Sequence, residues 1–399
     1  MSIVLVVNSG SSSFKYQLLD LSSQVTLAGG VVERIGQDSS RLAHRTGGLE
    51  EVRELPIADH SEGFALMLDT FAELGPQLDS LELNAVGHRV VHGGTLFVDP
   101  TIITDEVVEQ IEALSTLAPL HNPGAVQGIR AARTAFPAIP HVAVFDTAFH
   151  QTLSASAYTY AIDRRVAAAH GVRRYGFHGT SHRFVAEATA AFLGRPLVEV
   201  NSIVLHLGNG ASAAAIRGGV SVETSMGMTP LEGLVMGTRS GDIDPAILFH
   251  LNRVAGLGIR DLDGLLNHAS GMLGLTGKTD MRDIVAAAEA GDDSATLALD
   301  VYAHRVRGYI GAYLAHLGRL DALVFTAGVG ENNAQVRARA LDGLDHLGIT
   351  LDPVRNAAVS GEAREISAEG ARIRVLVVPT NEELEIARQS AAAITATAT

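Results

Sequence analysis

The chain has 399 residues, of which 47% are apolar and none is cysteine, and its formal net charge is −14. This length is too great for one ordinary hydrophobic core and suits two domains. The acidic balance argues against nucleic acid and anionic membranes as partners, and the lack of cysteine excludes disulfides, thiolate nucleophiles and Cys-ligated metal centres. No apolar run is long enough for a signal peptide or a membrane span, so we expect a soluble cytoplasmic protein.

The first 75 residues predict three strands and a helix. Apolar runs at 3–7, 14–20 and 25–33 are separated by short turns, which predicts an antiparallel start to a sheet. The polar stretch 36–48 is interpreted as an exposed hairpin or loop. Apolar residues at helical spacing predict a helix over 61–74.

The remainder of the first half mixes strands and helices. Strands are predicted at 85–94 and 141–145, and helices at 106–114 and 125–136. Asn122 and Pro123 form a typical signal for the start of the second helix. We expect the first domain to span residues 1–150.

The second half, residues 151–383, is expected to form the second domain. It opens with a strand, turn and strand around residue 203, followed by helices near 242–252, after 280 and over 294–317. A strand at 321–326, a helix from 331 and a strand at 375–378 come next. Thr380 and Glu383 have the spacing of a capping box for a last helix, about 384–399, which we expect to pack back on the first domain.

Two pairs of segments suggest an internal duplication. The strand and glycine turn at 203–212 resemble those at 3–15, and AVFDTAF at 143–149 resembles LVFTAGV at 323–329. Glycine turns of this kind let backbone amides converge on a phosphate. We therefore expect two related α/β halves, each offering a phosphate-binding loop to a shared cleft.

Three other patterns are less favoured interpretations. The segment from Gly208 to Ala213 matches a relaxed dinucleotide fingerprint, but strand character resumes where that motif requires a helix. Residues 271–279 resemble a P-loop with one residue too many and no buried strand before it. The histidine pairs 88/92 and 178/182 have the i, i+4 spacing of zinc ligands, but no third ligand is evident.

The segment from Thr224 to Pro245 contains five potential turn formers and one arginine, Arg239. It is interpreted either as a buried structural loop or as a loop that presents Arg239 in a cleft. A guanidinium group suits carboxylate or phosphate because its fork makes two parallel hydrogen bonds.

Nine motifs along the chain together resemble the acetate kinase family, part of the superfamily that includes sugar kinases, Hsp70 and actin. They are NSGSSSFK, HRVVHGG, PLHNP, FDTAFH, YGFHGTSH, HLGNGAS, TSMGMTPLEGLVMGTRSGDIDP, AGVGENN and PTNEE, and they run from Asn8 to Glu383. The resemblance implies an α/β fold of two duplicated ribonuclease H-like (actin-like ATPase) domains, with mixed sheets flanked by helices and a cleft between them. The first would lie on the acyl-substrate side and the second would bind the nucleotide.

The implied reaction is the reversible transfer of the γ-phosphoryl group of ATP to acetate. Acetate is already ionised at neutral pH, so its attack on phosphorus needs no general base. The difficulty lies in bringing one anion up to a polyanion, so positive charge and alignment must supply most of the catalysis.

The resemblance also assigns catalytic roles. Arg89 would bind the carboxylate or the incoming phosphoryl group, Arg239 would stabilise the transition state, and His178 would donate a hydrogen bond to the phosphoryl oxygens. His121 would contribute less. Asp146 corresponds to the catalytic acidic residue of the family, and we expect it to orient Arg89 or metal-bound water.

Further residues would bind nucleotide, metal and the acyl group. Those implied for ATP or ADP are Ser11, Ser13, Lys15, His206, Leu207, Gly208, Asn209, Gly210, Asp280, Met281, Arg282, Gly328, Val329, Gly330, Glu331 and Asn332. Asn8 and Glu382 would hold Mg²⁺, with Mn²⁺ as an alternative. Val91, Leu120, Phe177 and Pro230 would line the acyl pocket.

Two alternatives stay open. A propionate or butyrate kinase could use the same machinery, because one methylene changes binding by only about 1 to 3 kcal/mol. A non-catalytic ATP-binding regulator would have no use for the acyl-site residues. The resemblance also implies a homodimer, and the acidic charge leads us to expect no nucleic-acid or membrane partner.

Overall fold

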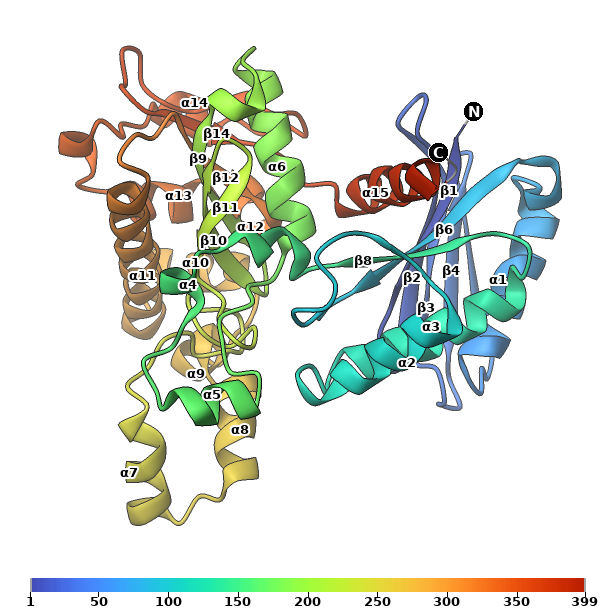
Figure 1. Ribbon diagram of the computed structural model, residues 1–399. Coiled ribbons are helices and arrows are strands. Elements are labelled where there is room, and N and C mark those ends of the chain that lie inside the picture. The colour runs from blue at the N-terminus through green and yellow to red at the C-terminus, as the bar shows by residue number, and fades with distance from the viewer. Residues whose placement is uncertain (1, 398–399) are drawn as a thin grey trace. The chain divides into compact units, whose positions relative to one another are not determined.

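The computed structural model describes residues 2–397, and its chain divides into two compact units. The first unit comprises Met1–Ala148 and Asn381–Thr399, and the second comprises Phe149–Thr380. Figure 1 follows the chain from the N-terminus in blue to the C-terminal helix in red. Residues 398–399 of the predicted last helix lie outside the described residues.

The first unit is built on an eight-stranded sheet with the order β5-β4-β3-β2-β1-β6-β8-β7. Its strands are β1 Ile3–Ser9, β2 Ser13–Asp20, β3 Val25–Glu33, β4 Arg41–Thr46, β5 Leu49–Glu54, β6 Leu83–Val90, β7 Thr101–Ile102 and β8 His141–Phe145. Strands β1 to β5 are antiparallel neighbours, while β6 and β8 are parallel to β1. The predicted antiparallel start is therefore confirmed.

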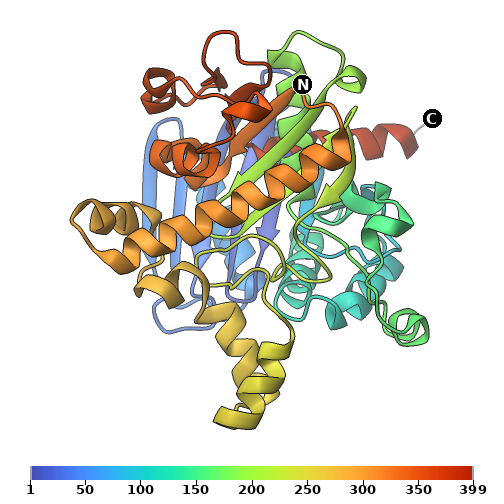
Figure 2. The same cartoon turned by 90° about the vertical axis from the view of Figure 1, so that its left-hand side faces the viewer.

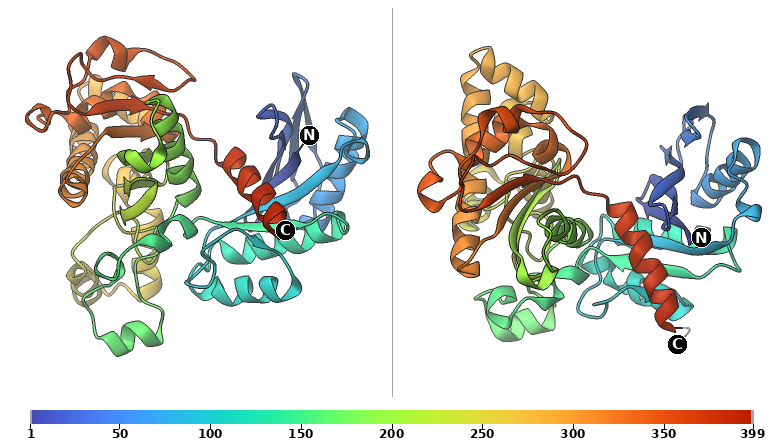
Figure 3. Two further views of the ribbon diagram at one scale, coloured as in Figure 1. Left: turned by 45° about the horizontal axis from the view of Figure 1, so that its top comes forward. Right: turned by 90° about the horizontal axis from the view of Figure 1, so that it is seen from above.

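Helices cover both faces of this sheet. They are α1 His60–Leu74, α2 Asp105–Ala113, α3 Asn122–Ala135 and α15 Glu382–Thr397. Alternate residues of β1 and β2 point toward α1 and α3 and form a core with Phe64, Phe71 and Ala132. Helix α15 lies on the opposite face along β1, β6 and β8 (Figure 3), where Ile386 and Ser390 approach Gly87.

The second unit is built on a six-stranded sheet with the order β11-β10-β9-β12-β14-β13. Its strands are β9 Asn201–Leu207, β10 Ala211–Arg217, β11 Val220–Thr224, β12 Ala322–Thr326, β13 Arg364–Glu365 and β14 Arg374–Val377. Its helices are α4 Ala155–Tyr158, α5 Arg164–Ala169, α6 Gly179–Phe192, α7 Ala246–Ala255, α8 Ile259–His268, α9 Gly271–Thr276, α10 Met281–Glu289, α11 Asp293–Leu317, α12 Ala327–Asn332, α13 Ala334–Leu341 and α14 Pro353–Ala357.

The two long helices of the second unit lie on opposite faces of its sheet. Helix α6 packs Val185 and Ala186 against Val204 and Val324. Helix α11 crosses the other face, as Figure 2 shows, and contacts β9, β10 and β11. Both parallel strands β9 and β12 are therefore buried on two sides, which explains their continuous apolar sequences.

Five strands of each sheet share one topology. The order β3-β2-β1-β6-β8 in the first unit corresponds to β11-β10-β9-β12-β14 in the second, with the first three antiparallel and the last two parallel. This arrangement confirms the duplicated α/β fold. The predicted match between AVFDTAF and LVFTAGV is wrong. AVFDTAF begins on β8, which corresponds to β14, whereas LVFTAGV begins on β12, which corresponds to β6.

Three local features differ from the predictions. The stretch 36–48 was predicted as an exposed hairpin or loop, and residues 41–46 do form a hairpin strand, β4, with β5, but Leu42, Ala43 and His44 are buried. Helix α6, which begins at Gly179, was not predicted. Asn381, not Thr380, caps α15, because its Oδ1 accepts a hydrogen bond from the backbone N–H of Leu384 at 2.9 Å.

None of the helices that the structure describes is long and apolar enough to cross a membrane.

Candidate active site

Arg89 and Asp146 form the central contact of the first unit. Arg89 lies on β6, and Asp146 follows the last residue of the neighbouring parallel strand β8, so both lie near the carboxyl ends of the strands. Nε of Arg89 donates to Oδ1 of Asp146 at 3.0 Å, and Nη2 donates to Oδ2 at 2.6 Å. This two-pronged contact fixes the plane of the guanidinium group.

Asn8 and Glu382 approach the same guanidinium group from β1 and from the start of α15. Oδ1 of Asn8 lies 3.5 Å from Nη1 of Arg89, and Oε2 of Glu382 lies 3.9 Å from Nε. Burial lowers the pKa of Arg89, but the carboxylates of Asp146 and Glu382 outweigh burial and raise that pKa. The arginine therefore stays cationic.

Burial raises the pKa of both carboxyl groups around Arg89, and the positive charge of Arg89 opposes this rise. Asp146 is 1% exposed, whereas the side chain of Glu382 is 23% exposed. Only Glu382 of the two is therefore accessible to a ligand from solvent.

A buried asparagine connects two further predicted segments of this unit. Asn122, at the start of α3, accepts from the backbone N–H of His92 at 3.2 Å and donates to its carbonyl at 3.0 Å. His121 occupies the capping position of α3 and lies close enough to Asp146 to lower its pKa. The loop after Arg89 and the segment of His121 are thus held together.

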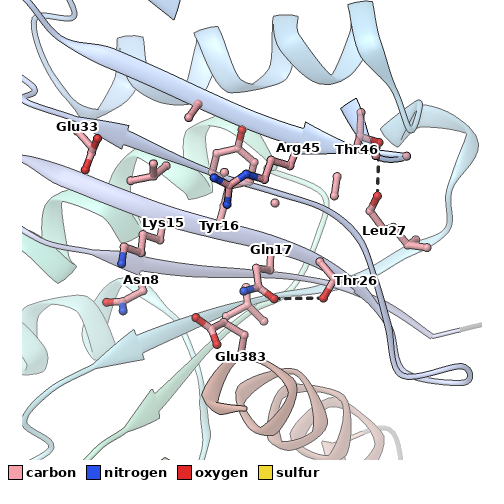
Figure 4. A pocket seen from close by; sticks show the side chains of 18 of the residues that line it. Asn8, Lys15, Tyr16, Gln17, Thr26, Leu27, Glu33, Arg45, Thr46 and Glu383 are labelled. Atoms are coloured by element: carbon pink, nitrogen blue, oxygen red, sulfur yellow. Dashed lines mark hydrogen bonds between the residues drawn. The ribbon is translucent and has the colours of Figure 1, made fainter. Parts of the chain in front are cut away.

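The turn between β1 and β2 carries Ser11, and Ser13 begins β2. The first turn of α3 packs against it so closely that a Cβ on Gly124 would lie 2.6 Å from the backbone N of Ser11. Lys15 is opposite Asn8 in the β1–β2 register, so both side chains point to the same face. There they line a pocket of about 600 Å³ together with Glu383, as Figure 4 shows.

In the second unit, two segments predicted to bind nucleotide lie side by side at the ends of parallel strands. The β9–β10 turn contains Gly208, Asn209 and Gly210, and follows His206 and Leu207. Its neighbour is α12, which contains Gly328, Val329, Gly330, Glu331 and Asn332. Thr326, before α12, pairs with His206.

The side chain of Glu331 occupies the start of its own helix. Its Oε1 accepts from the backbone N–H groups of Ala327 at 2.8 Å and of Thr380 at 3.2 Å. This contact ties α12 to the last residue of the second unit. The α12 amides are therefore not simply open to a phosphate, as the glycines alone would suggest.

His178 and Arg239 meet at the β9–β10 turn. A Cβ built on Gly210 would lie 3.5 Å from Nη1 of Arg239 and 3.6 Å from Nε2 of His178. His178 has a left-handed backbone, with φ of 56°, and directly precedes α6. A non-glycine residue in this conformation is uncommon and is held there by its surroundings.

The segment 224–245 holds Arg239 by backbone contacts. Gly237 donates to the carbonyl of Asn209 at 2.9 Å, and Arg239 Nη1 donates to the carbonyl of Pro230 at 3.2 Å. Arg239 forms no ion pair with a carboxylate in the described part of the chain. Burial lowers the pKa of Arg239, which remains far above neutrality. The segment is therefore tied to the β9–β10 turn by backbone contacts, and its arginine has no carboxylate partner among the described residues.

The segment from Asp280 to Arg282 begins α10. Asp280 caps this helix by accepting from the backbone N–H of Arg282, and its carboxylate also pairs with the Arg282 guanidinium at 2.5 Å. The Arg282 side chain lowers the pKa of Asp280 to about 2. Met281 is buried between them.

The predicted acyl-pocket residues come from both units. Val91 follows β6, and Leu120 precedes His121 and is 61% exposed. Phe177 is buried beside His178, and Pro230 supplies the carbonyl that Arg239 contacts. Each residue thus lies within two positions of a predicted catalytic residue in the sequence or, for Pro230, contacts one.

The histidine pairs do not form metal sites. His88 bonds to His141 at 2.9 Å rather than facing His92, whose Nδ1 accepts from Gly94. Among the side chains that the structure describes, no three from His, Asp or Glu gather as a metal-binding group. The segment that resembles a dinucleotide fingerprint is followed by strand β10 rather than by a helix. The segment that resembles a P-loop forms helix α9 at 271–276 rather than a phosphate-binding loop.

Sequence reasoning missed the residues that hold the predicted ones in place. Asn122 appeared only as part of a helix start signal, and Ser181 and Ser212 appeared only as letters in motifs. Ser181 bonds to His206 Nδ1 and to Thr380 Oγ1, both at 2.8 Å. Their one sequence signal is a small polar residue inside an apolar element.

Comparison with known proteins agrees with this geometry. The sequence profile of the Acetokinase family matches residues 3–388. The acetate kinase of Clavibacter michiganensis subsp. michiganensis is 66% identical over 393 residues, which cover 98% of this chain and 99% of that protein.

Two solved structures share the fold over nearly their whole length. The acetate kinase of Porphyromonas gingivalis has a TM-score of 0.95 at 42% identity and covers 99% of this chain, which in turn covers all of that chain. A propionate kinase from Francisella tularensis has a TM-score of 0.92 at 40% identity, with 98% and 99% covered. The chain belongs to the acetokinase family.

Proposed function

We propose that this enzyme transfers the γ-phosphoryl group of ATP directly to acetate, with the residue roles set out below. The first unit supplies Arg89 for the carboxylate or the incoming phosphoryl group, with His121 in a lesser role. The second unit supplies His178 and Arg239 for the phosphoryl oxygens. Acetyl phosphate and ADP are the products, and the reaction is reversible.

The observation that carries this proposal is the meeting of Arg239 and His178 at the β9–β10 turn. Both side chains would lie within 3.6 Å of a Cβ placed on Gly210, and Arg239 has no carboxylate partner among the described residues. Phosphoryl transfer spreads negative charge over the equatorial oxygens, which cations and hydrogen-bond donors stabilise. At the β9–β10 glycine turn, the guanidinium group of Arg239 provides the cation and the imidazole of His178 provides the hydrogen-bond donor.

The remaining nucleotide contacts follow the same pattern. Ser11, Ser13 and Lys15 in the first unit, and the segments 206–210, 280–282 and 328–332 in the second, would contact ATP or ADP. The β9–β10 turn supports this assignment best, because its glycines leave the backbone open to a phosphate.

Asp146 would act by holding Arg89. Both of its carboxylate oxygens accept hydrogen bonds from Arg89, and its side chain is almost fully buried. Acetate has no proton to lose at neutral pH, so a base at this position would have no task. We therefore assign Asp146 a positioning role.

Asn8 and Glu382 would hold Mg²⁺, or Mn²⁺ in its place. Both bring an oxygen atom to the Arg89 guanidinium group, Asn8 at Nη1 and Glu382 at Nε. A single carboxylate with an amide oxygen fits Mg²⁺, which keeps several waters and binds phosphate oxygens. When bound, the ion would neutralise part of the charge on the β- and γ-phosphates.

Acetate is the proposed acceptor, with propionate as a slower one. The alternative is a preference for propionate, as the name of the Francisella tularensis relative suggests for that protein. A hydroxamate assay with acetate, propionate and butyrate at equal concentrations tests this choice. We expect kcat/KM to be highest with acetate, and no product with any of the three would overturn the proposal.

We further propose that the enzyme acts as a homodimer in the cytoplasm. Helix α7 supports the first point, because none of its ten residues is buried and it exposes Ile247, Phe249 and Val254. Such a helix would be covered by a second copy of the chain.

A further inference from the structure

His178 is the end of a series of three hydrogen-bonded side chains in the second unit, with Ser212 in the middle and His182 at the other end. Nδ1 of His178 lies 3.0 Å from Oγ of Ser212, and the same oxygen lies 2.8 Å from Nε2 of His182. Ser212 is on β10 and His182 is in the first turn of α6. Both are fully buried, so their positions are fixed by the core.

The direction of these hydrogen bonds follows from their donors and acceptors. A serine hydroxyl carries one proton, so Ser212 donates to one histidine and accepts from the other. Nδ1 of His182 is buried and has no hydrogen-bond partner among the described residues. An orphaned N–H is rarer in proteins than an orphaned acceptor, so the proton of His182 belongs on Nε2.

The protons of Ser212 and His178 then have only one possible arrangement. Nε2 of His182 donates to Ser212, and Ser212 donates to Nδ1 of His178. Nδ1 of His178 is therefore an acceptor, and a neutral imidazole in that state carries its proton on Nε2. Burial lowers the pKa of His182 well below its usual value, and His182 therefore stays neutral.

We infer that His182 and Ser212 are positioning residues that fix His178 as the Nε2–H tautomer and direct that N–H toward the β9–β10 turn. This inference rests on the proposed function, in which His178 donates to the phosphoryl oxygens. Without the two residues, the ring of His178 could place a lone pair where the donor is needed.

Other groups around the rings matter for the pH dependence. His206, from β9, stacks on His178 with 4.2 Å between ring centroids and 20° between planes. Arg239 approaches from its loop, and His150 meets His182 edge-on at 5.6 Å. Ser181 bonds to Nδ1 of His206 at 2.8 Å, whereas Ser212 bonds to His178 and His182, so the two serines hold different rings.

The test is the kinetics of Ser212→Ala at pH 8 and pH 6, with acetate and ATP. At pH 8 we expect kcat to fall about tenfold while both KM values change little, as for other partners that orient a functional histidine. An imidazolium ion carries protons on both nitrogens and cannot present the wrong tautomer. The deficit relative to the unsubstituted enzyme should therefore shrink at pH 6.

Ser221→Ala is the matched control. It removes the same hydroxyl from another buried serine–histidine pair of the same sheet, in which Ser221 lies 2.8 Å from Nδ1 of His150. We expect its kcat to stay within about twofold of the unsubstituted value, since it leaves the His178 chain intact. A second pair of variants, His182→Gln and His182→Leu, differs in whether residue 182 can donate to Ser212, and the glutamine variant should keep the higher kcat.

The tautomer can also be read without any assay. Long-range ¹H–¹⁵N spectra of histidine-labelled protein, assigned with His178→Asn, should show an unprotonated Nδ1 in His178 and a loss of that state in Ser212→Ala. An Nδ1–H tautomer in the unsubstituted protein would overturn the inference. So would an equal, pH-independent loss of kcat in Ser212→Ala and Ser221→Ala, which would indicate a merely structural role.

Failure of the proposed function would look different. If His178→Asn retained full kcat, the role of His178 in phosphoryl transfer would be wrong. The spectra would then still decide whether Ser212 and His182 set its tautomer.

Discussion

The guanidinium plane of Arg89 is set by Asp146, and lysine cannot reproduce that contact. We expect Arg89→Lys to reduce kcat/KM for acetate by about 100-fold, because an ammonium group keeps the charge but loses the paired hydrogen bonds. Steady-state kinetics with acetate varied would measure the loss. Arg130→Lys is the control, since Arg130 pairs with Glu112 on the exposed surface, where such pairs contribute little. Near-normal activity in Arg89→Lys would show that charge alone suffices.

Asp146 is assigned a role that operates only through Arg89, and a double-mutant cycle can test this. We expect Asp146→Ala and Arg89→Ala each to lower kcat/KM by about 100-fold or more, and the double variant to be no worse than Arg89→Ala. Independent, multiplying losses would mean that Asp146 has its own catalytic task.

For single residues, the sequence predicted those that carry charge or ring nitrogens, because their chemistry is visible in a motif. It did not predict Asn122, Ser212 or Glu331 as positioning groups. Their roles depend on which strand ends adjoin, and Ser212 matters only because β10 brings it beside α6.

Most elements were predicted where apolar spacing was regular. The burial of strand β4 was missed because His44, a polar residue in sequence, is buried and hydrogen-bonded to Tyr16 at 2.8 Å. Helix α6 was missed because a glycine opens it after a left-handed residue, which no spacing rule reveals. The cap of α15 was placed one residue early, since Thr380 instead bonds to Ser181.

The cap of α15 matters because the next residue is Glu382. We expect Asn381→Ala to reduce the free energy of unfolding by about 1 kcal/mol, as for other lost caps, and to raise the Mg²⁺ concentration needed for half-maximal activity. Asp59→Ala is a matched control, since Asp59 caps α1 in the same way by accepting from Glu62. It should lose similar stability at unchanged Mg²⁺ requirement.

Urea unfolding and Mg²⁺ titration of the two cap variants give both quantities. An equal shift of the Mg²⁺ requirement in Asn381→Ala and Asp59→Ala would mean that general destabilisation, rather than the position of Glu382, sets metal use.

For the whole molecule, the duplication was predictable from the repeated strand and glycine turn, but not from the similarity between AVFDTAF and LVFTAGV. Short apolar strands that end in small residues look alike, so β8 and β12 resembled each other although their places in the two sheets differ. Only strand order separates such matches, and strand order depends on contacts between distant residues.

The cores of both units bury neutral histidines, which makes stability depend on pH. Burial lowers the pKa of His141 and of His150 to about 4, and also lowers the pKa of the other members of this group, His44, His88 and His182. Unfolding returns these rings to a pKa near 6.5, so the unfolded state binds more protons below that pH. Stability is then complete above pH 6.5 and falls as the pH drops toward 4.

Within this pH window, each such histidine changes the free energy of unfolding by up to about 1.4 kcal/mol per pH unit. The raised pKa values of Asp146 and Glu382 act in the opposite direction, but the histidines are more numerous. We expect the urea midpoint to fall steadily from pH 7 to pH 5. A flat profile would contradict buried neutral histidines.

The exposed apolar face of α7 gives the last prediction, which concerns assembly. Phe249 is 63% exposed and Val254 is 65% exposed, and a helix with no buried residue gains little from its own unit. Burying such side chains between two copies would contribute about 1.5 to 3 kcal/mol each. We therefore expect Phe249→Asp to shift a dimer to monomers in sedimentation experiments, while Val359→Asp, an equally apolar and more exposed site elsewhere, leaves it intact. A dimer that survives Phe249→Asp, or a monomeric unsubstituted protein, would show that α7 does not form the interface.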